Sequence, residues 1–330
     1  MHGWLIIDKP VGPGSTQIVG AVKRALREGG YAKVKVGHGG TLDPLASGVL
    51  PVALGEATKL SGRMLDADKA YDFTIRFGEE TDTLDAEGKV IATSERRPTL
   101  AEVEAVLPRF TGAIEQLPPA FSALKVDGKR AYDLARAGEE VKLATRSVTI
   151  HELKILPGTG RGTAAEGGGG GAGTMPTPAQ PLHHPSGGPP PRSGEDLDEI
   201  TLSARVSKGT YIRSLARDIA HALNTVGHVT MLRRTKAGPF TLERAISLDN
   251  LADLAKARRL EEALLPLAAG LDDIPALTVT PREADLLRVG QQPTGSAARP
   301  GLHLALLDDV PVALVECSEG VLRVVRGFNL

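Results

Sequence analysis

The sequence is poor in residues that hold domains together covalently or through metal ions. Cys317 is the only cysteine among 330 residues, which excludes an intramolecular disulfide and a cysteine-based zinc site. Aromatic residues make up 3% of the chain and hydrophobic residues 41%, so we expect a core built mainly from Leu, Val, Ala and Ile. Because tyrosines are scarce, each tyrosine beside a polar motif is a candidate functional residue.

Long apolar runs are missing as well. The N-terminal stretch MHGWLIIDKP has too short an apolar segment and the wrong flanking residues for a signal peptide. No run reaches the roughly 20 residues of a transmembrane helix. P-loop, HExxH and GxSxG patterns are absent, and no metal, nucleotide or redox cofactor is implied. We therefore expect a soluble cytoplasmic protein that works without a cofactor.

The charge is nearly balanced overall but unevenly distributed. A formal net charge of −1 is a weak indication against a nucleic-acid partner. Between residues 203 and 244, however, eight lysines and arginines accompany two acidic residues, and 8 − 2 = +6. A basic face of this kind can follow a phosphate backbone, although a solvated charged surface explains such a cluster equally well.

Residues 37–59, GHGGTLDPLASGVLPVALGEATK, join a histidine, a glycine pair and an aspartate to an apolar run. Gly39 and Gly40 permit positive φ and close approach of another backbone. Pro44 keeps Asp43 extended, so a carboxylate is held on a stiff loop at the edge of a core. An active site needs such a group, but aspartate before proline is also typical of an ordinary turn.

Periodic apolar residues predict the elements around this loop. A short strand is expected at residues 4–7, followed by a helix that Ser15 caps and that ends at Gly29 and Gly30. Residues 71–77 alternate between apolar and polar side chains, as a half-buried strand does. The same reasoning predicts a helix after the capping box at Thr99, a helix ending at Gly138, strands at residues 146–156 and 200–206, and a helix from residue 212.

The stretch at residues 37–59 resembles the signature of the TruB family of tRNA pseudouridine synthases. Further matching segments extend the resemblance over most of residues 2–245: DKP near the N-terminus, DKAYDFTIRFGEETDTLDAEG, QLPPAFSALK, SKGTYIR and HVTMLRRTKAGPF. The resemblance implies an α+β pseudouridine synthase fold, with a central mixed or antiparallel sheet flanked by helices. It also implies that the protein isomerises uridine to pseudouridine at position 55 in the T loop of tRNA.

The resemblance implies roles for individual residues. The aspartate of the family signature is catalytic and corresponds to Asp43. The arginine of KGTYIR, here Arg213, pairs with that aspartate, although an arginine on a helix is otherwise most often a surface residue. His38 would fill the space that the flipped base vacates in the RNA loop. Whether Asp43 attacks the sugar or the ring, or first removes a proton, is left open.

Three other residues would surround the target base. By resemblance Tyr71 contacts the base, although core or edge packing is the usual role of a tyrosine at a strand start. Tyr211 would line the base pocket and Leu232 would border the uridine. Lys9 and Asp85 lie in matched segments and are candidate supporting residues.

Composition changes between residues 157 and 199. Gly, Pro, Ser and Thr dominate this stretch, which predicts a disordered insertion in the catalytic domain. A formal GxGxxG at residues 168–173 has no predicted strand before it and no helix after it, so no dinucleotide site is expected. His183 and His184 lack a third ligand and are interpreted as solvated. The acidic residues at 82–87 lack the spacing of an EF-hand loop, and we expect a hairpin turn there.

The resemblance also divides the chain. Residues 1–245 would form the catalytic domain, residues 246–270 a helical connection, and residues 271–330 a small β-rich domain that is similar to a PUA domain and binds RNA. The expected partner is the T-arm stem-loop of tRNA, and a monomer without an obligatory protein partner or a membrane is expected. Two alternatives are a guide-dependent H/ACA-type synthase and a protein that folds or binds tRNA without chemistry.

Overall fold

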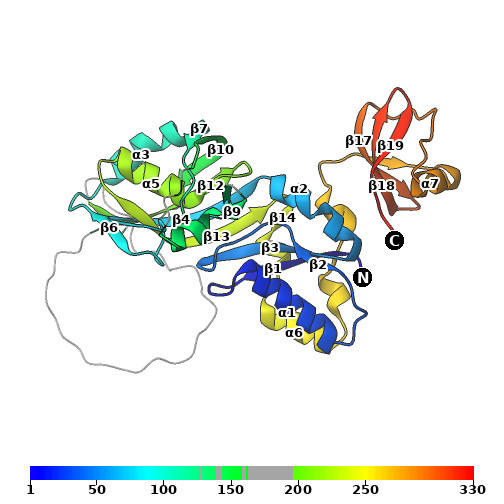
Figure 1. Cartoon of the computed structure of the whole chain (residues 1–330), viewed down its shortest axis with the longest axis horizontal. Helices are drawn as coiled ribbons and strands as arrows, with labels where there is room; N and C mark the ends of the chain where they lie inside the picture. The colour runs from blue at the N-terminus through cyan, green and yellow to red at the C-terminus, as the bar shows by residue number, and fades with distance from the viewer. Residues whose placement is uncertain (123, 127, 139–140, 142, 158–160, 163–195) are drawn as a thin grey trace. The chain divides into compact units, whose positions relative to one another are not determined.

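The computed structural model describes residues 1–122, 124–126, 128–138, 141, 143–157, 161–162 and 196–330 (Figure 1). Most of the predicted insertion, including the GxGxxG segment and the two adjacent histidines, lies outside the described residues. By backbone proximity the chain divides into two units. One comprises Met1–Lys69 and Arg233–Leu330, and the other comprises Ala70–Leu232. The boundaries expected at residues 245 and 270 stay a prediction.

The first unit contains strands from distant parts of the sequence. β1 (Gly3–Lys9) pairs antiparallel with β3 (Ala46–Leu54) along its whole length. β15 (Leu265–Pro266) pairs with the start of β1, and β2 (Val36–His38) pairs with β3. The strand order in this unit is β15-β1-β3-β13. β1 contains residues 4–7, so the strand predicted there is confirmed, and Trp4 and the three residues after it are all buried.

Two helices of the first unit, α1 (Ser15–Glu28) and α6 (Leu248–Lys256), lie side by side (Figure 1). α1 buries the predicted apolar stripe, including Ile18 and Val22. The predicted cap at Ser15 is wrong, because Gly14 is the N-cap and the Ser15 hydroxyl bonds the backbone of Leu42 instead. The short helix α2 (Ser61–Asp66) follows a 3-10 turn at Gly55–Leu60.

The C-terminal part of the first unit is a small sheet with strand order β16-β17-β18-β19. Its apolar side chains form a cluster of their own around Ala284, Val312 and Val315. This sheet confirms the small β-rich domain that the sequence predicts. The elements are β16 (Ala276–Thr278), α7 (Pro281–Arg288), β17 (Gly301–Leu307), β18 (Val310–Ser318) and β19 (Val321–Gly327).

The second unit has the strand order β13-β4-β12-β10-β7. β12 begins earlier than the predicted residue 200, because Leu197 and Glu199 pair with the short β11 (Arg161–Gly162). The long strands are β4 (Lys69–Phe77), β7 (Gly112–Gln116), β10 (Arg146–Ile155), β12 (Leu197–Val206) and β13 (Gly227–Ala237), of which residues 233–237 belong to the first unit.

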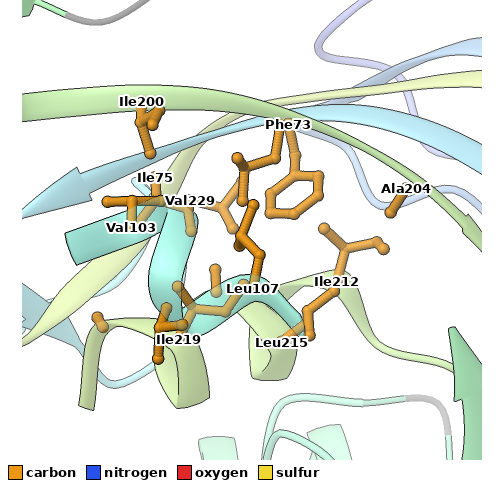
Figure 2. Packing of buried hydrophobic residues seen from close by; sticks show 14 of the residues in the cluster. Phe73, Ile75, Val103, Leu107, Ile200, Ala204, Ile212, Leu215, Ile219 and Val229 are labelled. Carbon is orange, nitrogen blue, oxygen red and sulfur yellow. The ribbon is translucent and has the colours of Figure 1, made fainter. Parts of the chain in front are cut away.

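Two helices of the second unit, α3 (Leu100–Val106) and α5 (Ile212–Ala222), pack against this sheet. Figure 2 shows Phe73 of β4 and Ile200 of β12 pointing toward Leu107, Leu215 and Ile219 from the helical layer. The expected capping box forms at α3, where the Thr99 side chain accepts from the Glu102 backbone N–H and Glu102 bonds the Thr99 N–H in return.

Shorter elements complete the second unit. The hairpin expected near residues 82–88 is confirmed as β5 (Glu79–Thr81) paired with β6 (Val90–Thr93). β8 (Lys125–Val126), β9 (Lys129–Arg130) and α4 (Ala131–Arg136) lie between β7 and β10. Sheets and helices together confirm the predicted α+β class. Among the described residues, no helix is long and apolar enough to span a membrane.

Candidate active site

Asp43 lies on the loop between β2 and β3, where its side chain is half-buried. The backbone of this loop requires glycine at two places. Gly40 has a φ of +132°, and Gly48, the third residue of β3, has a φ of +101°. A Cβ at Gly48 would also collide with the carbonyl oxygen of Arg234. The path of the loop is therefore narrowly determined by its sequence and its neighbours.

Lys9, at the end of β1, is fully buried beneath this loop. Its ammonium donates to the carbonyls of Pro10 at 2.9 Å, Pro44 at 3.2 Å and Ala46 at 2.6 Å, so its three N–H donors match three acceptors. Burial lowers the pKa of Lys9 from 10.5 to about 8, against the opposing effect of the Asp43 charge. Lys9 is thus within electrostatic reach of the predicted catalytic carboxylate.

Ser15 and Arg234 hold the same loop from two other elements. The Leu42 N–H donates to the Ser15 hydroxyl at 2.8 Å, and that hydroxyl donates to the Leu42 carbonyl at 3.1 Å. The Arg234 guanidinium, in β13, donates to the carbonyls of Val49 at 2.8 Å and Thr41 at 3.2 Å. Both side chains are buried. Side chains from a strand, a helix and a second strand therefore fix the backbone around Asp43.

His38 is the last residue of β2 and immediately precedes this loop. Burial lowers the pKa of His38, and the positive charge of Arg234 lowers it further. A hydrogen bond with the Gly40 backbone acts in the opposite direction. The imidazole is therefore expected to be mainly neutral at physiological pH, which suits a side chain that fills space in an RNA loop.

Arg213 lies at the start of α5 in the second unit, with only 6% of its surface exposed. Arg213 is therefore not the surface residue that an arginine on a helix most often is. Its guanidinium donates to the carbonyls of Thr83 at 2.7 Å and Phe121 at 3.0 Å, and it forms an ion pair of 3.2 Å with Asp85. The predicted pairing of Arg213 with Asp43 stays a prediction.

Asp85, the other candidate supporting residue, is held by its own turn. One carboxylate oxygen accepts from the Thr83 hydroxyl at 2.6 Å and from the Glu87 N–H at 3.1 Å, and the other oxygen faces Arg213. Leu84, between Thr83 and Asp85 in the sequence, has a backbone φ of 63°, which is uncommon for a residue with a large side chain. Strained backbone of this kind often occurs where a functional group must be held in place.

Tyr211 is the N-cap of α5 and is held on two sides. The Gln116 side chain accepts from the Tyr211 N–H at 2.8 Å and donates to the Tyr211 carbonyl at 3.1 Å. The Arg146 guanidinium lies 4.7 Å from the centre of the Tyr211 ring and donates to the carbonyl of Gly209. Backbone and ring are therefore both restrained at the position predicted to line the base pocket.

Tyr71 and Leu232 border the core of the second unit. Both are partly buried and pack against the cluster that contains Phe73 and Val229. Tyr71 lies in β4 and Leu232 in β13. Their roles at the target base stay predictions.

Sequence reasoning missed Ser15, Gln116, Arg146 and Arg234 as parts of the candidate site. All four act on backbone groups or on a ring rather than on another charged side chain, so no pairing pattern in the sequence marks them. Gln116 and Arg234 lie within segments that resemble the family, and this resemblance is the sequence feature that could have marked them as site residues. Among the described residues, no group of three His, Cys, Asp or Glu side chains is placed to hold a metal ion.

Comparisons with known proteins decide the family. The model of the TruB family pseudouridylate synthase N-terminal domain matches residues 26–165, and that of the tRNA pseudouridylate synthase B C-terminal domain matches residues 213–272. The chain is 57% identical over 330 residues to the tRNA pseudouridine synthase B of Novosphingobium aromaticivorans, with 100% of this chain and 98% of that protein covered. The chain belongs to the TruB family of pseudouridine synthases. The tRNA pseudouridine synthase B of Zymomonas mobilis is 54% identical over 331 residues, with 100% and 96% covered.

A solved structure supports the fold of this TruB family protein. The structure of an H/ACA RNP bound to a substrate RNA containing 2′-deoxyuridine matches with a TM-score of 0.66 and 22% sequence identity, covering 99% of this chain and 85% of the matched chain. At this identity the match shows a shared fold alone. The guide-dependent group is therefore a distant structural relative, and the predicted TruB resemblance is confirmed.

Proposed function

We propose that this TruB family enzyme isomerises uridine to pseudouridine at position 55 in the T loop of tRNA. The observation that carries the proposal is the restraint of the loop around Asp43 by Lys9, Ser15 and Arg234. A carboxylate on so constrained a backbone is preorganised for a reaction. The names of the two relatives, tRNA pseudouridine synthase B, supply the substrate class.

The reaction breaks the bond between ribose and a ring nitrogen of uracil, turns the ring, and joins the ribose to a ring carbon. The base must first leave its stack, which costs a few kcal/mol and less where the base is already loosely held in a loop. Asp43 supplies the catalytic carboxylate, whether it attacks the sugar, attacks the ring or first removes a proton. No oxidant or reductant is consumed, because the product is an isomer of the substrate.

The remaining predicted residues would hold the RNA and the detached base. Arg213 would act as the counter-ion of Asp43, with Asp85 orienting its guanidinium. Tyr71 would stack on uracil, since base–aromatic stacking is worth about 1–3 kcal/mol. Tyr211 and Leu232 would form the walls of the base pocket and exclude water, and His38 would occupy the gap left in the T loop. The proposed site thus consists of Asp43, the six residues named in this paragraph as its partners, and Lys9.

The proposal extends to how the enzyme meets its substrate. The T-arm stem-loop alone would suffice for recognition, and the small sheet at residues 271–330 would add contacts to the RNA. The enzyme would work in the cytoplasm as a monomer, with no obligatory protein partner and no guide RNA. Light scattering of the purified protein, alone and with tRNA, tests the monomer directly.

We predict that Asp43→Ala abolishes turnover of an unmodified T-arm stem-loop. Pseudouridine formation replaces the hydrogen on uracil C5, so release of tritium from that carbon measures the reaction. Because one carboxylate facing RNA adds no affinity, the variant should bind the stem-loop within roughly 1 kcal/mol of the wild type.

Asp285→Asn is the matched control, because Asp285 is an exposed carboxylate on α7 whose ion-pair partner in the described part of the chain is Arg288, at 2.9 Å. It should leave turnover unchanged. Turnover by Asp43→Ala would contradict the catalytic assignment. Absence of product from the wild type, with binding intact, would favour the guide-dependent or tRNA-folding alternatives.

A further inference from the structure

The backbone on both sides of Asp43 is held by side chains from three separate elements. Lys9 of β1 bonds the backbone after Asp43, and Ser15 of α1 bonds the backbone before it. Arg234 of β13 is the one side chain of the three that bonds both sides. Its loss would therefore remove one side-chain contact on each side of Asp43 at once.

The Arg234 guanidinium is suited to this task by its shape. Its Nε donates to the Val49 carbonyl at 2.8 Å and its Nη1 to the Thr41 carbonyl at 3.2 Å. A planar fork with fixed donor directions can hold two acceptors at once, whereas the single ammonium of lysine cannot reproduce that geometry. The residue is 1% exposed, so water does not compete for these bonds.

Two further observations separate Arg234 from an ordinary core residue. Its Nη2 is buried and has no hydrogen-bond partner among the described residues. An unpaired donor on a buried cation is unfavourable, so the position of this guanidinium calls for an explanation. A Cβ at Gly40 would lie 3.6 Å from Nη1, so the guanidinium also lies directly against the glycine turn that precedes Asp43.

We propose that Arg234 is a positioning residue for the isomerisation, which presents the Asp43 carboxylate in one orientation by fixing the backbone from Thr41 to Val49. The inference rests on the catalytic role proposed above for Asp43. Arg234 acts through the loop and does not touch the substrate. Its removal should therefore lower kcat much more than it changes KM or the affinity for RNA.

The neighbouring arginine offers a matched control. Arg233 bonds the carboxylate of Asp8 at 2.8 and 3.1 Å, and its side chain is 29% exposed. Among the described residues its hydrogen bonds reach side chains and not the backbone of the Asp43 loop, the remaining one being donated to the Ser47 hydroxyl at 3.4 Å. Arg233→Met removes an arginine of the same size from the same strand without removing the two carbonyl contacts.

The test compares Arg234→Lys, Arg234→Ala and Arg233→Met on the T-arm stem-loop. Displacing a catalytic group by about 1 Å lowers the rate roughly 100-fold. Both Arg234 variants should therefore lose about 10- to 100-fold in kcat. KM and the Kd for the stem-loop should stay within about 3-fold, and Arg233→Met should keep kcat within about 2-fold. Equal losses in Arg234→Lys and Arg233→Met would overturn the proposal.

Chemical rescue distinguishes positioning from general stability. Added guanidinium ion should enter the space left in Arg234→Ala and restore part of kcat, whereas equal sodium chloride should not. Ser15→Ala, a smaller change, should give the same loss of kcat at constant KM if Arg234→Ala does not fold. Failure of both rescue and the Ser15 effect, with Asp43→Ala inactive, would overturn the role of Arg234 and leave the proposed function standing.

Discussion

At the scale of single residues, Lys9 links the candidate site to pH. Its buried ammonium satisfies three carbonyls, and its pKa is about 8 instead of 10.5 because burial disfavours the charge. The charged groups that face it act in opposite directions. Asp43 raises the pKa of Lys9, whereas Arg234 lowers it. A small rise in pH above neutrality should therefore change both the protonation of Lys9 and its hydrogen bonds to the loop that carries Asp43.

We predict that stability and activity respond to alkaline pH in opposite directions. Between pH 8 and 10.5 the folded chain has lost the Lys9 proton while the unfolded chain keeps it. The unfolded state then binds more protons, so the free energy of unfolding rises with pH, by at most about 1.4 kcal/mol per pH unit. The neutral amine has two donors for three carbonyls, so kcat should fall over the same window.

Urea unfolding and kcat at several pH values, for wild type and Lys9→Met, measure this effect. Other titrating groups are common to both chains, so the difference between the two free energies isolates Lys9. A difference that stays flat above pH 8 would show that the buried amine keeps its proton.

Sequence reasoning at this scale predicts the residues with side-chain chemistry but missed the side chains that hold them. The glycines and proline around Asp43 indicate a stiff loop that could also be an ordinary turn, and the family signature is what predicts a catalytic role for Asp43. Ser15 was predicted to cap its own helix, but its hydroxyl bonds Leu42 across the fold. Nothing local distinguishes these two uses of a serine hydroxyl, since each satisfies one backbone donor.

At the scale of elements, the start of α5 depends on a side chain from an edge strand. Gln116, the last residue of β7, is fully buried and makes both hydrogen bonds to the Tyr211 backbone. Tyr211 is the N-cap of the helix that also carries Arg213. One amide therefore helps to fix the helix start that carries both predicted site residues.

We predict that Gln116→Ala lowers the free energy of unfolding by about 1–3 kcal/mol, because it leaves a buried N–H unpaired. It should also lower kcat, since the helix start that carries Arg213 is no longer fixed. Gln17→Ala is the control, because Gln17 accepts from the Gly14 N–H at 2.7 Å at an exposed helix start. Thermal unfolding and stem-loop turnover measure both effects, and equal changes in the two variants would contradict the prediction.

Elements with local signals were predicted well. The capping box at Thr99, the alternation in β4 and the hairpin of β5 and β6 all depend on residues close in sequence. The start of β12 was misplaced because it pairs with β11, whose residues lie inside the stretch that composition marked as an insertion. The paired segments of β11 and the start of β12 are too short to show the alternation of apolar and polar residues that predicts a strand.

At the scale of the whole molecule, the structure gives narrower boundaries for a deletion that tests whether the predicted insertion is needed for activity. Arg161 pairs with Glu199, and Gly162 pairs with Leu197, so these residues belong to the sheet. We predict that replacing residues 163–195 with a short Gly-Ser linker keeps kcat and KM on the stem-loop within about 2-fold, because a long flexible loop costs little to close. A large loss of RNA affinity would show that the replaced residues contact the substrate.

The division into two units also has a consequence for folding during synthesis on the ribosome. Asp43 is synthesised 191 residues before Arg234 (234 − 43 = 191), an interval of about 10–40 s at typical rates of translation. During that interval Ala70–Leu232 is synthesised completely, whereas β1 and β3 still lack β13 and β15. The unit whose residues are synthesised first can therefore complete its sheet only after the second unit has been synthesised, and until then its apolar strands lack their partners.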